Sequence, residues 1–396
     1  MYLGMKKLFI PISYVNSAGP DSALSADDLR LRKLLSEAFR TMDEHYYLPV
    51  SPEIYEKFVQ DFPAERLKTL NEKNKKTPDF VHLGAGLLVD RLKSPRDKFT
   101  NFVPPEKEKE FKEKAYAVTE DLGLEGKLDK SSFLITHVQK HAEAFEKGVR
   151  PGDRLLKIDG RALDADEAEI RKKLSGPVGT TTRLLFLLSS TGRQKEIILE
   201  SKSYFKETVE ALSTDVPGVL ALKITHFNQK TSEDFSEEMV LVGTGRIRHL
   251  IIDLRDNGGG PPLAAREILG FFLPPNDPLF AIARKKKRPV MLTAPSQPVS
   301  YHGPITMLVN HKTGSAAEMF SGILQSKKLA DLVGEKTAGA TYLKSIYDLG
   351  DGSLIFMITS LTYFYDHRVY PADGLTPDTL LPSGGDSLRF TLDKIR

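Results

Sequence analysis

The sequence of 396 residues contains no cysteine. This absence excludes disulfide bonds, a thiolate nucleophile, and zinc or iron–sulfur sites with cysteine ligands. No apolar run approaches the roughly 18 residues that cross a bilayer, so we expect no integral membrane span. The net charge of +3 is nearly neutral for this length and gives no reason to expect a nucleic-acid partner. The spacing of the histidines suggests no metal site, and we expect no cofactor.

The beginning of the chain gives a weak indication of export. A basic end is followed by the apolar stretch Leu8–Val15, which Pro11 interrupts, and Ser17 to Gly19 form only a loose match to a cleavage site. We therefore expect residues 1–24 to be an N-terminal segment that is at most a weak export signal. The expected location is periplasmic or otherwise exported, with a cytoplasmic location left open.

Hydrophobic periodicity divides the remaining chain into three regions. Residues 25–114 are mostly helical in pattern, and residues 115–202 combine short strands with a tight turn at Asp159–Gly160. From residue 203 to 396, apolar strands alternate with amphipathic helices. The sequence therefore predicts a multidomain α/β protein with a helical N-terminal region, a β-rich domain and an α/β sheet core.

The stretch from Ile305 to Glu318 is the one around which the other motifs are arranged. Residues 305–309 form an apolar, β-branched run typical of a buried strand, Gly314 permits a tight turn, and Ser315 begins a helix. A serine at such a turn presents its hydroxyl outward, beside unpaired N–H groups of the first helical turn. This arrangement suits a nucleophile with an anion site. The alternative is a plain N-cap, with Glu318 completing a capping box.

A second motif is the glycine run Gly258–Gly260, which follows an apolar strand and the sequence Arg255-Asp-Asn. A strand, a glycine run and a helix also occur in phosphate-binding loops. Here the lysine and the Ser/Thr of a P-loop are absent and two prolines follow, which argues against a nucleotide site. The simpler alternative is a turn whose backbone needs glycine.

Four segments together resemble the carboxyl-terminal processing (tail-specific) serine peptidases: Asp253–Gly260, Val309–Glu318, Leu332–Gly339 and Gly374–Asp378. The segment Gly148–Gly160 is similar to a bacterial PDZ domain inserted in that family. The resemblance implies a helical N-terminal segment at 25–114, a PDZ domain at 115–202 and a peptidase core at 203–396.

The resemblance also implies roles for individual residues. It makes Ser315 the nucleophile and Ala316 one oxyanion donor, with Gly258 or Gly259 as the other. PDZ domains hold a peptide as an added strand and bind its terminal carboxylate on backbone N–H groups. The matching loop here is Leu122, Gly123 and Leu124, preceded by Asp121 where a glycine is usual.

One position departs from the family pattern. The family's base is a lysine, and the matching residue here is Ala340. Lys344, four residues further on, replaces that base if the chain bends to bring it close and apolar neighbours lower its pKa. The alternatives are a solvated Lys344 and a base role for His311.

Two functions therefore stay open at this point. The first is a serine endopeptidase that captures the C-termini of proteins or peptides in the PDZ groove and cleaves them with Ser315 and Lys344. The second is an inactive relative that binds peptide tails as an adaptor, suggested by Ala340. The sequence leaves the oligomeric state open.

Overall fold

The computed structural model describes residues 24–74, 79–163, 166–340, 342–366, 368, 370 and 373–396. Apart from Leu24, the segment considered as an export signal lies outside the described residues. The described residues form two compact units. Unit 1 takes its residues from Met1–Lys109, Arg284–Lys287 and Leu343–Leu361, and unit 2 from Glu110–Ala283, Arg288–Tyr342 and Thr362–Arg396. No helix in the described ranges is long and apolar enough to cross a membrane.

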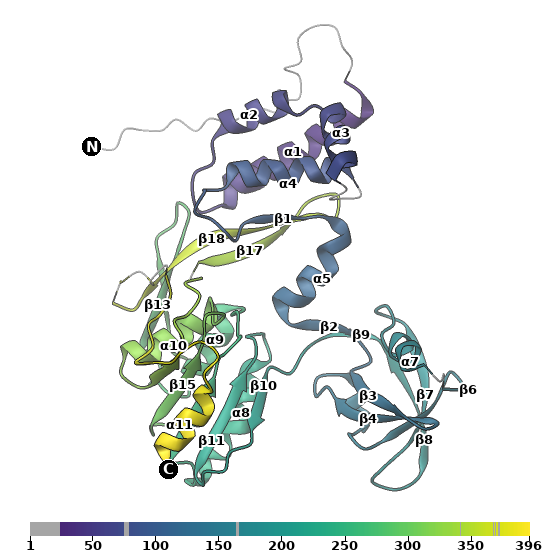
Figure 1. Cartoon of the computed structure of the whole chain (residues 1–396), viewed down its shortest axis with the longest axis vertical. Coiled ribbons are helices and arrows are strands. Elements are labelled where there is room, and N and C mark those ends of the chain that lie inside the picture. Colours follow the sequence, from purple (N-terminus) through teal and green to yellow (C-terminus); the bar gives the residue numbers. More distant parts are fainter. Residues whose placement is uncertain are drawn as a thin grey trace. The chain divides into compact units, whose positions relative to one another are not determined.

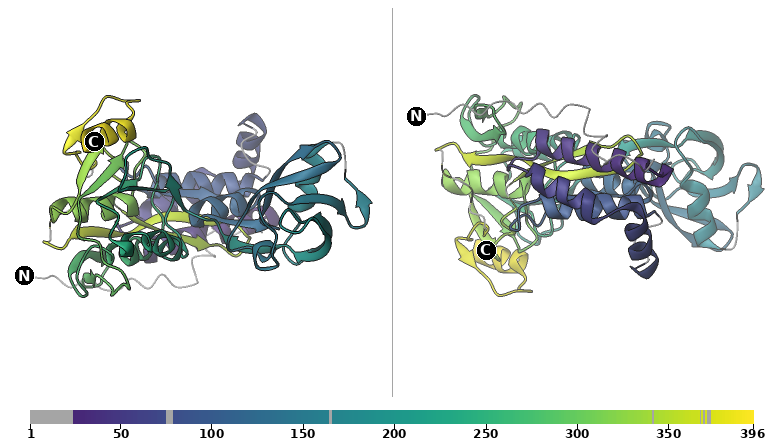
Figure 2. Two further views of the ribbon diagram at one scale, coloured as in Figure 1. Left: turned by 90° about the horizontal axis from the view of Figure 1, so that it is seen from below. Right: turned by 90° about the horizontal axis from the view of Figure 1, so that it is seen from above.

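Unit 1 combines helices with a small antiparallel sheet (Figure 1). Its helices are α1 (Ala26–His45), α2 (Pro52–Asp61), α3 (Ala64–Asn74) and α4 (Phe80–Leu92). Its strands are β1 (Asn101–Val103), β17 (Leu343–Asp348) and the part of β18 (Leu354–Phe364) up to Leu361. Side-chain caps begin three of the helices: Ser25 accepts from the Asp28 N–H at 3.1 Å, Ser51 from the Ile54 N–H at 3.3 Å, and Asp79 from the Val81 N–H at 2.9 Å. Strands β1 and β17 both pair antiparallel with β18. Figure 2 shows α1 and α4 running side by side.

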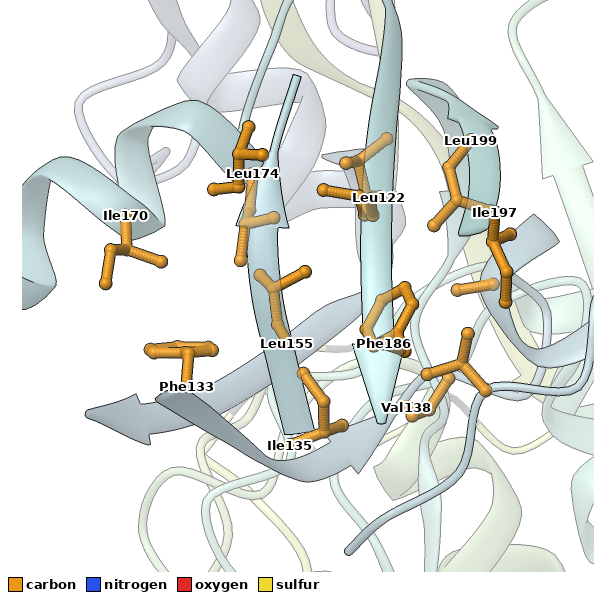
Figure 3. Packing of buried hydrophobic residues seen from close by; sticks show 14 residues of the cluster. Leu122, Phe133, Ile135, Val138, Leu155, Ile170, Leu174, Phe186, Ile197 and Leu199 are labelled. Carbon is orange, nitrogen blue, oxygen red and sulfur yellow. The ribbon is translucent and has the colours of Figure 1, made fainter. Parts of the chain in front are cut away.

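The first part of unit 2 is a β-rich domain with its own apolar core (Figure 3). Its elements are β2 (Val118–Asp121), β3 (Leu124–Asp129), β4 (Ser132–Val138), α6 (Glu143–Glu146), β5 (Arg154–Ile158), β6 (Arg161–Ala162), α7 (Glu167–Leu174), β7 (Thr181–Leu187), β8 (Gln194–Glu200) and β9 (Lys202–Phe205). The turn predicted at Asp159–Gly160 is present, and both residues have positive φ, 48° and 75°. Ile170 and Leu174 of α7 face the core, as a helical period predicts.

The second part of unit 2 is built on a six-stranded sheet in the order β10, β11, β12, β15, β16, β19. These strands are β10 (Val209–Leu212), β11 (Val219–Ile224), β12 (His249–Asp253), β15 (Ile305–Val309), β16 (Asp331–Gly334) and β19 (Thr379–Leu380). The accompanying elements are α8 (Thr231–Met239), α9 (Pro262–Leu269), α10 (Ala316–Ser326), α11 (Ser387–Ile395) and the hairpin β13 (Pro278–Arg284) and β14 (Val290–Thr293). All strands from β11 to β19 in this sheet run parallel. Their carboxyl ends therefore share one edge, the usual place for a site in such a sheet.

The expected fold class is confirmed, and the strand predicted at 305–309 has those bounds. Two long-range features were not predicted. Strands β17 and β18 belong to unit 1 although they lie late in the sequence. Residues 203–205 continue β9, which pairs with β2, so this segment lies with the β-rich domain. The helix α5 (Pro105–Tyr116) precedes that domain and is rich in lysine and glutamate.

Candidate active site

Ser315 lies on the turn between β15 and α10. The five residues of β15 are all buried, as expected for a central parallel strand. The turn is fixed by hydrogen bonds from Thr313 Oγ1 to the Leu254 carbonyl at 2.8 Å and from the Gly314 N–H to the Asn257 carbonyl at 2.9 Å. The ends of β12 and β15 are thereby joined directly before the serine.

The backbone of Ser315 is strained. Its φ of 52° and ψ of −118° lie in a region that residues with a side chain rarely adopt. The Ser315 N–H donates to Glu318 Oε2 at 2.9 Å, which is the Glu318 half of the predicted capping box. A strained strand-to-helix turn that exposes a serine is the arrangement of a nucleophile elbow. The backbone conformation of the half-buried Ser315 therefore differs from that of an ordinary N-cap.

The glycine run lies directly against this serine. A Cβ on Gly259, whose φ is 107°, would lie 2.7 Å from Ser315 Cβ and 2.9 Å from the Ala316 nitrogen. The Gly259 N–H donates to Asn257 Oδ1 at 2.8 Å, while the N–H groups of Gly258 and Ala316 donate to no residue in the described part of the chain. Gly258 and Ala316 are therefore the donors left for an oxyanion, and a donor role for Gly259 stays a prediction.

Asn257 was not singled out from the sequence. Its side chain is fully buried, and its Nδ2 donates to the Ile224 carbonyl at 2.8 Å while its Oδ1 accepts from Gly259. Asn257 thus ties the glycine run to the end of β11. The sequence signal for Asn257 was its place in Arg255-Asp-Asn, directly before the glycines. The hydrogen bonds that Asn257 makes can be recognised only in the folded structure.

Glu318 is fully buried and carries four hydrogen bonds. Besides the Ser315 N–H, its carboxylate accepts from Thr337 Oγ1 at 2.6 Å and from the N–H groups of Gly339 and Ala340 at 2.7 and 2.8 Å. A buried carboxylate is tolerated when its oxygens are satisfied in this way. Glu318 therefore joins the serine turn to the segment that carries residue 340.

Residue 340 is placed next to the serine turn. The Ala340 methyl group is buried and lies 3.7 Å from the position of a Cβ on Gly314. A longer side chain at this position would start beside the nucleophile. Residue 340 thus lies beside the Ser315 turn, and its alanine side chain has no group that could accept a proton.

Lys344 lies on β17 in unit 1, with its Nζ 4.2 Å from the centroid of the Phe99 ring. An aromatic face favours the charged ammonium, whereas a base must be neutral. Because β17 begins at Leu343, Ala340 does not belong to the strand that carries Lys344. The role of Lys344 as base stays a prediction.

Two histidines lie near the motifs. His311 is exposed, and its Nδ1 is 2.5 Å from Glu335 Oε2, a contact that lowers the pKa of Glu335. His226 was not singled out from the sequence. Its Nε2 lies 3.0 Å from the position of a Cβ on Gly260, and burial lowers its pKa so that the ring is neutral at pH 7. Among the described residues, no group of three or more acidic or histidine side chains is arranged to bind a metal ion.

The predicted carboxylate loop of the β-rich domain is formed, and the N–H groups of Leu122 and Gly123 are engaged. The Leu122 N–H donates to the Leu174 carbonyl at 3.2 Å, and the Gly123 N–H donates to Asp121 Oδ1 at 2.6 Å. The Leu122 side chain is part of the domain core, and Leu124 begins β3.

Comparisons with family models identify both parts of unit 2. Residues 218–381 match peptidase family S41, and residues 134–188 match a PDZ domain. The region 218–381 is thus similar to peptidase family S41. The S41 match includes Asn257, Ser315, Glu318 and Ala340, so the site described above lies inside the peptidase region.

Proteins similar to this chain carry the names of processing peptidases. "Carboxyl-terminal-processing peptidase 2, chloroplastic" of Arabidopsis thaliana is 26% identical over 390 residues, covering 94% of this chain and 72% of the relative. "Carboxy-terminal processing protease CtpB" of Bacillus subtilis is 25% identical over 278 residues, covering 68% of this chain and 57% of the relative. The aligned part thus leaves a substantial share of each relative unmatched.

Two solved structures share the fold of this chain. The photosystem II D1 C-terminal processing protease aligns with a TM-score of 0.52 and 20% identity, over 93% of this chain and 97% of that one. The tricorn protease aligns with a TM-score of 0.51 and 16% identity, over 92% of this chain and 36% of that one. At these identities the likeness concerns the fold alone.

Proposed function

We propose that the protein is a serine endopeptidase in which Ser315 is the nucleophile. The observation that supports this most is the strained Ser315 turn packed against Gly259, with the N–H groups of Gly258 and Ala316 unengaged among the described residues. Strain of this kind persists only where the surrounding structure holds it in place, and it is typical of active sites. A helix N-cap alone does not require it.

The chemistry follows from this arrangement. Ser315 Oγ attacks the peptide carbonyl carbon, a base takes the hydroxyl proton, and the carbonyl oxygen becomes an anion that the Gly258 and Ala316 N–H groups stabilise. The protonated base then gives its proton to the leaving amine as the C–N bond breaks. Water then attacks the acyl-enzyme. The base takes a proton from the water and gives it to Ser315 Oγ as the ester bond breaks. Lys344 is the proposed base, with His311 and His226 as alternatives.

The PDZ domain supplies the substrate-binding part of this proposal. A peptide added as a strand beside β3 would present an extended chain to the protease, and the tails of proteins or peptides are the proposed ligands. The relatives named as C-terminal processing proteases support this substrate class. We also propose an exported location, which rests on the first residues of the sequence alone.

A serine-directed fluorophosphonate probe tests the nucleophile. We expect the probe to label the wild type and not Ser315→Ala. Ser326→Ala is the matched control, because Ser326 ends the same helix and donates to the Ile323 carbonyl; it should label like the wild type. No labelling and no peptide cleavage of the wild type between pH 6 and 10 would contradict the proposal.

One observation favours a second function. The buried Ala340 leaves the place of the usual base filled by a methyl group, which suits an inactive S41 protein that binds peptide tails as an adaptor. Binding of labelled peptides by the full chain without any cleavage would support the adaptor. Cleavage that disappears in Ser315→Ala would exclude it.

A further inference from the structure

The carboxylate loop of the PDZ domain already holds a carboxylate, that of Asp121. Asp121 Oδ1 accepts from the Gly123 N–H at 2.6 Å and from the Tyr204 hydroxyl, and its Oδ2 accepts from Thr119 Oγ1 at 3.0 Å. Three donors therefore converge on this side chain. Burial and the neighbouring Asp121 both raise the pKa of Tyr204, so the phenol keeps its proton and donates.

The other N–H of the loop is engaged as well. The Leu122 N–H donates to the carbonyl of Leu174, the last residue of α7. Gly123 has a φ of 72°, and a Cβ there would lie 2.2 Å from Ala142 Cβ, so the loop conformation requires glycine at this position. The loop thus has the shape of a carboxylate site in which the Leu122 and Gly123 donors are satisfied from within the chain.

We propose that Asp121 is a specificity-determining residue that occupies the place of a ligand's terminal carboxylate, so that the PDZ domain accepts extended segments without selecting a free C-terminus. This inference rests on the proposed peptide binding by the PDZ domain and refines its substrate class. An incoming carboxylate has to displace Asp121 from the Gly123 N–H and then lie beside a second anion, which repels it. A segment that continues past this point, or ends in an amide, brings no such charge.

The edge of β3 is also occupied, and any peptide that binds there as an added strand has to displace side chains of α7. Arg171 of α7 donates to the Gly126 carbonyl, and Glu167 accepts from the Leu128 N–H at 2.9 Å. Both side chains are largely exposed, so an added strand can displace them without uncovering the core. Because these contacts lie on the strand and not on the loop, they affect free-acid and amidated peptides alike.

Peptide binding by the full chain carrying Ser315→Ala tests the proposal without cleavage. The probes are two fluorescein-labelled decapeptides of one sequence ending in Val-Ala-Ala, one with a free carboxylate and one amidated. We expect the Asp121 protein to bind the two within about threefold of each other. Adding Asp121→Gly should create a preference of about tenfold or more for the free acid, because the Gly123 donor becomes available.

Two further variants separate the causes. Asp121→Asn keeps an acceptor for the Gly123 N–H and should gain much less free-acid preference than Asp121→Gly. Arg171→Ala opens the β3 edge and should change the affinity for both probes in parallel. Thermal melting of each variant checks that the chain is folded.

A tenfold preference for the free acid with Asp121 present would overturn the proposal. So would an Asp121→Gly protein that is folded and shows no gain in that preference. Because the readout is binding by Ser315→Ala, failure of the proposed peptidase activity leaves this result unaffected.

Discussion

Glu318 Oε2 accepts hydrogen bonds from the backbone N–H groups of both Ser315 and Ala340, at 2.9 and 2.8 Å. One oxygen atom therefore holds the backbone of the proposed nucleophile and the backbone of residue 340. In the family that the sequence resembles, the lysine base stands at this second position. The backbone framework for a base at residue 340 is complete although the side chain is a methyl group. Activity in this protein then depends on a base supplied from elsewhere, or is absent.

Substitution of Ala340 by lysine distinguishes these cases. The Ala340 methyl group points to the Gly314 turn, so Ala340→Lys starts a lysine side chain beside Ser315. If the protein lacks an effective base, this change should raise the peptidase rate by about 10²- to 10⁴-fold, the usual contribution of a general base. If Lys344 is the base, Ala340→Lys should add little, and Lys344→Ala should abolish cleavage without affecting peptide binding. Initial rates on a casein substrate measure both effects.

A silent Lys344→Ala would contradict the assignment of Lys344. The same assay applied to His311→Ala and His226→Ala then locates the base. For His226, whose pKa is lowered by burial, the rate should rise with pH through a value below the ordinary ~6.5 of histidine, because the neutral ring is the active form. His311→Ala is the comparison for an exposed ring, since the His311 side chain lies on the turn that precedes Ser315.

The two neighbouring glycines allow a matched test of the oxyanion site. Gly259→Ala places a Cβ 2.7 Å from Ser315 Cβ at a φ of 107°, so we expect the turn to shift and activity to fall by about 100-fold or more. Gly258→Ala meets no atom within 4 Å and should leave folding unchanged. Probe labelling measures the activity of both variants, and circular dichroism measures their folding. Equal activity of Gly259→Ala and the wild type would show that catalysis does not depend on the close approach of Gly259 to Ser315.

Glu318 is expected to matter for stability and for the site together. Glu318→Ala leaves three N–H groups and the Thr337 hydroxyl without an acceptor in a buried position, which costs about 3 kcal/mol or more. Glu318→Gln keeps the shape but turns an NH₂ donor toward other donors, so it should also lose labelling of Ser315. Urea unfolding monitored by fluorescence or circular dichroism gives the free energy of unfolding. A Glu318→Gln protein with unchanged stability and labelling would contradict this role.

The sequence predicted those parts of the fold whose signal is local. Strand β15 is a continuous apolar run because it is buried on both faces, and the Asp159–Gly160 turn needs two residues that tolerate positive φ. The return of β17 and β18 to unit 1 depends on pairing with residues more than 200 positions away, such as Asn101 with Phe356, which periodicity does not reveal.

For the candidate site, too, the local motifs were predicted and the contacts between distant segments were not. The Ser315 turn and the glycine run were visible as motifs because each needs particular residues at fixed spacing. The capping box accounted for Glu318 locally, but its bonds to Thr337, Gly339 and Ala340 come from a later segment and were not foreseen. The Asn257 contact that engages the Gly259 N–H also depends on the folded turn, and it changes which glycine is available as a donor.

Asp97 leads to a prediction about the acid stability of unit 1. Burial alone would raise the pKa of Asp97, but hydrogen bonds from Thr100, Phe99 and the Tyr46 hydroxyl outweigh it and lower the pKa below its ordinary value. The folded state therefore binds fewer protons at this carboxyl than the unfolded state does. Its contribution to stability is fully present above the unfolded pKa of about 3.9 and is lost as the pH falls through the folded pKa.

Asp97→Asn should remove this contribution. We expect the variant to be less stable than the wild type by about 1–3 kcal/mol at pH 7, since the Tyr46 hydroxyl loses its charged acceptor, and the difference should shrink between pH 5 and pH 3. Asp90→Asn is the control, because the Asp90 side chain is exposed and should leave the pH dependence as in the wild type. Urea unfolding at each pH gives the curves. Parallel curves for Asp97→Asn and the wild type would show that Asp97 is not linked to folding, because a lowered pKa in the folded state requires the two curves to converge in acid.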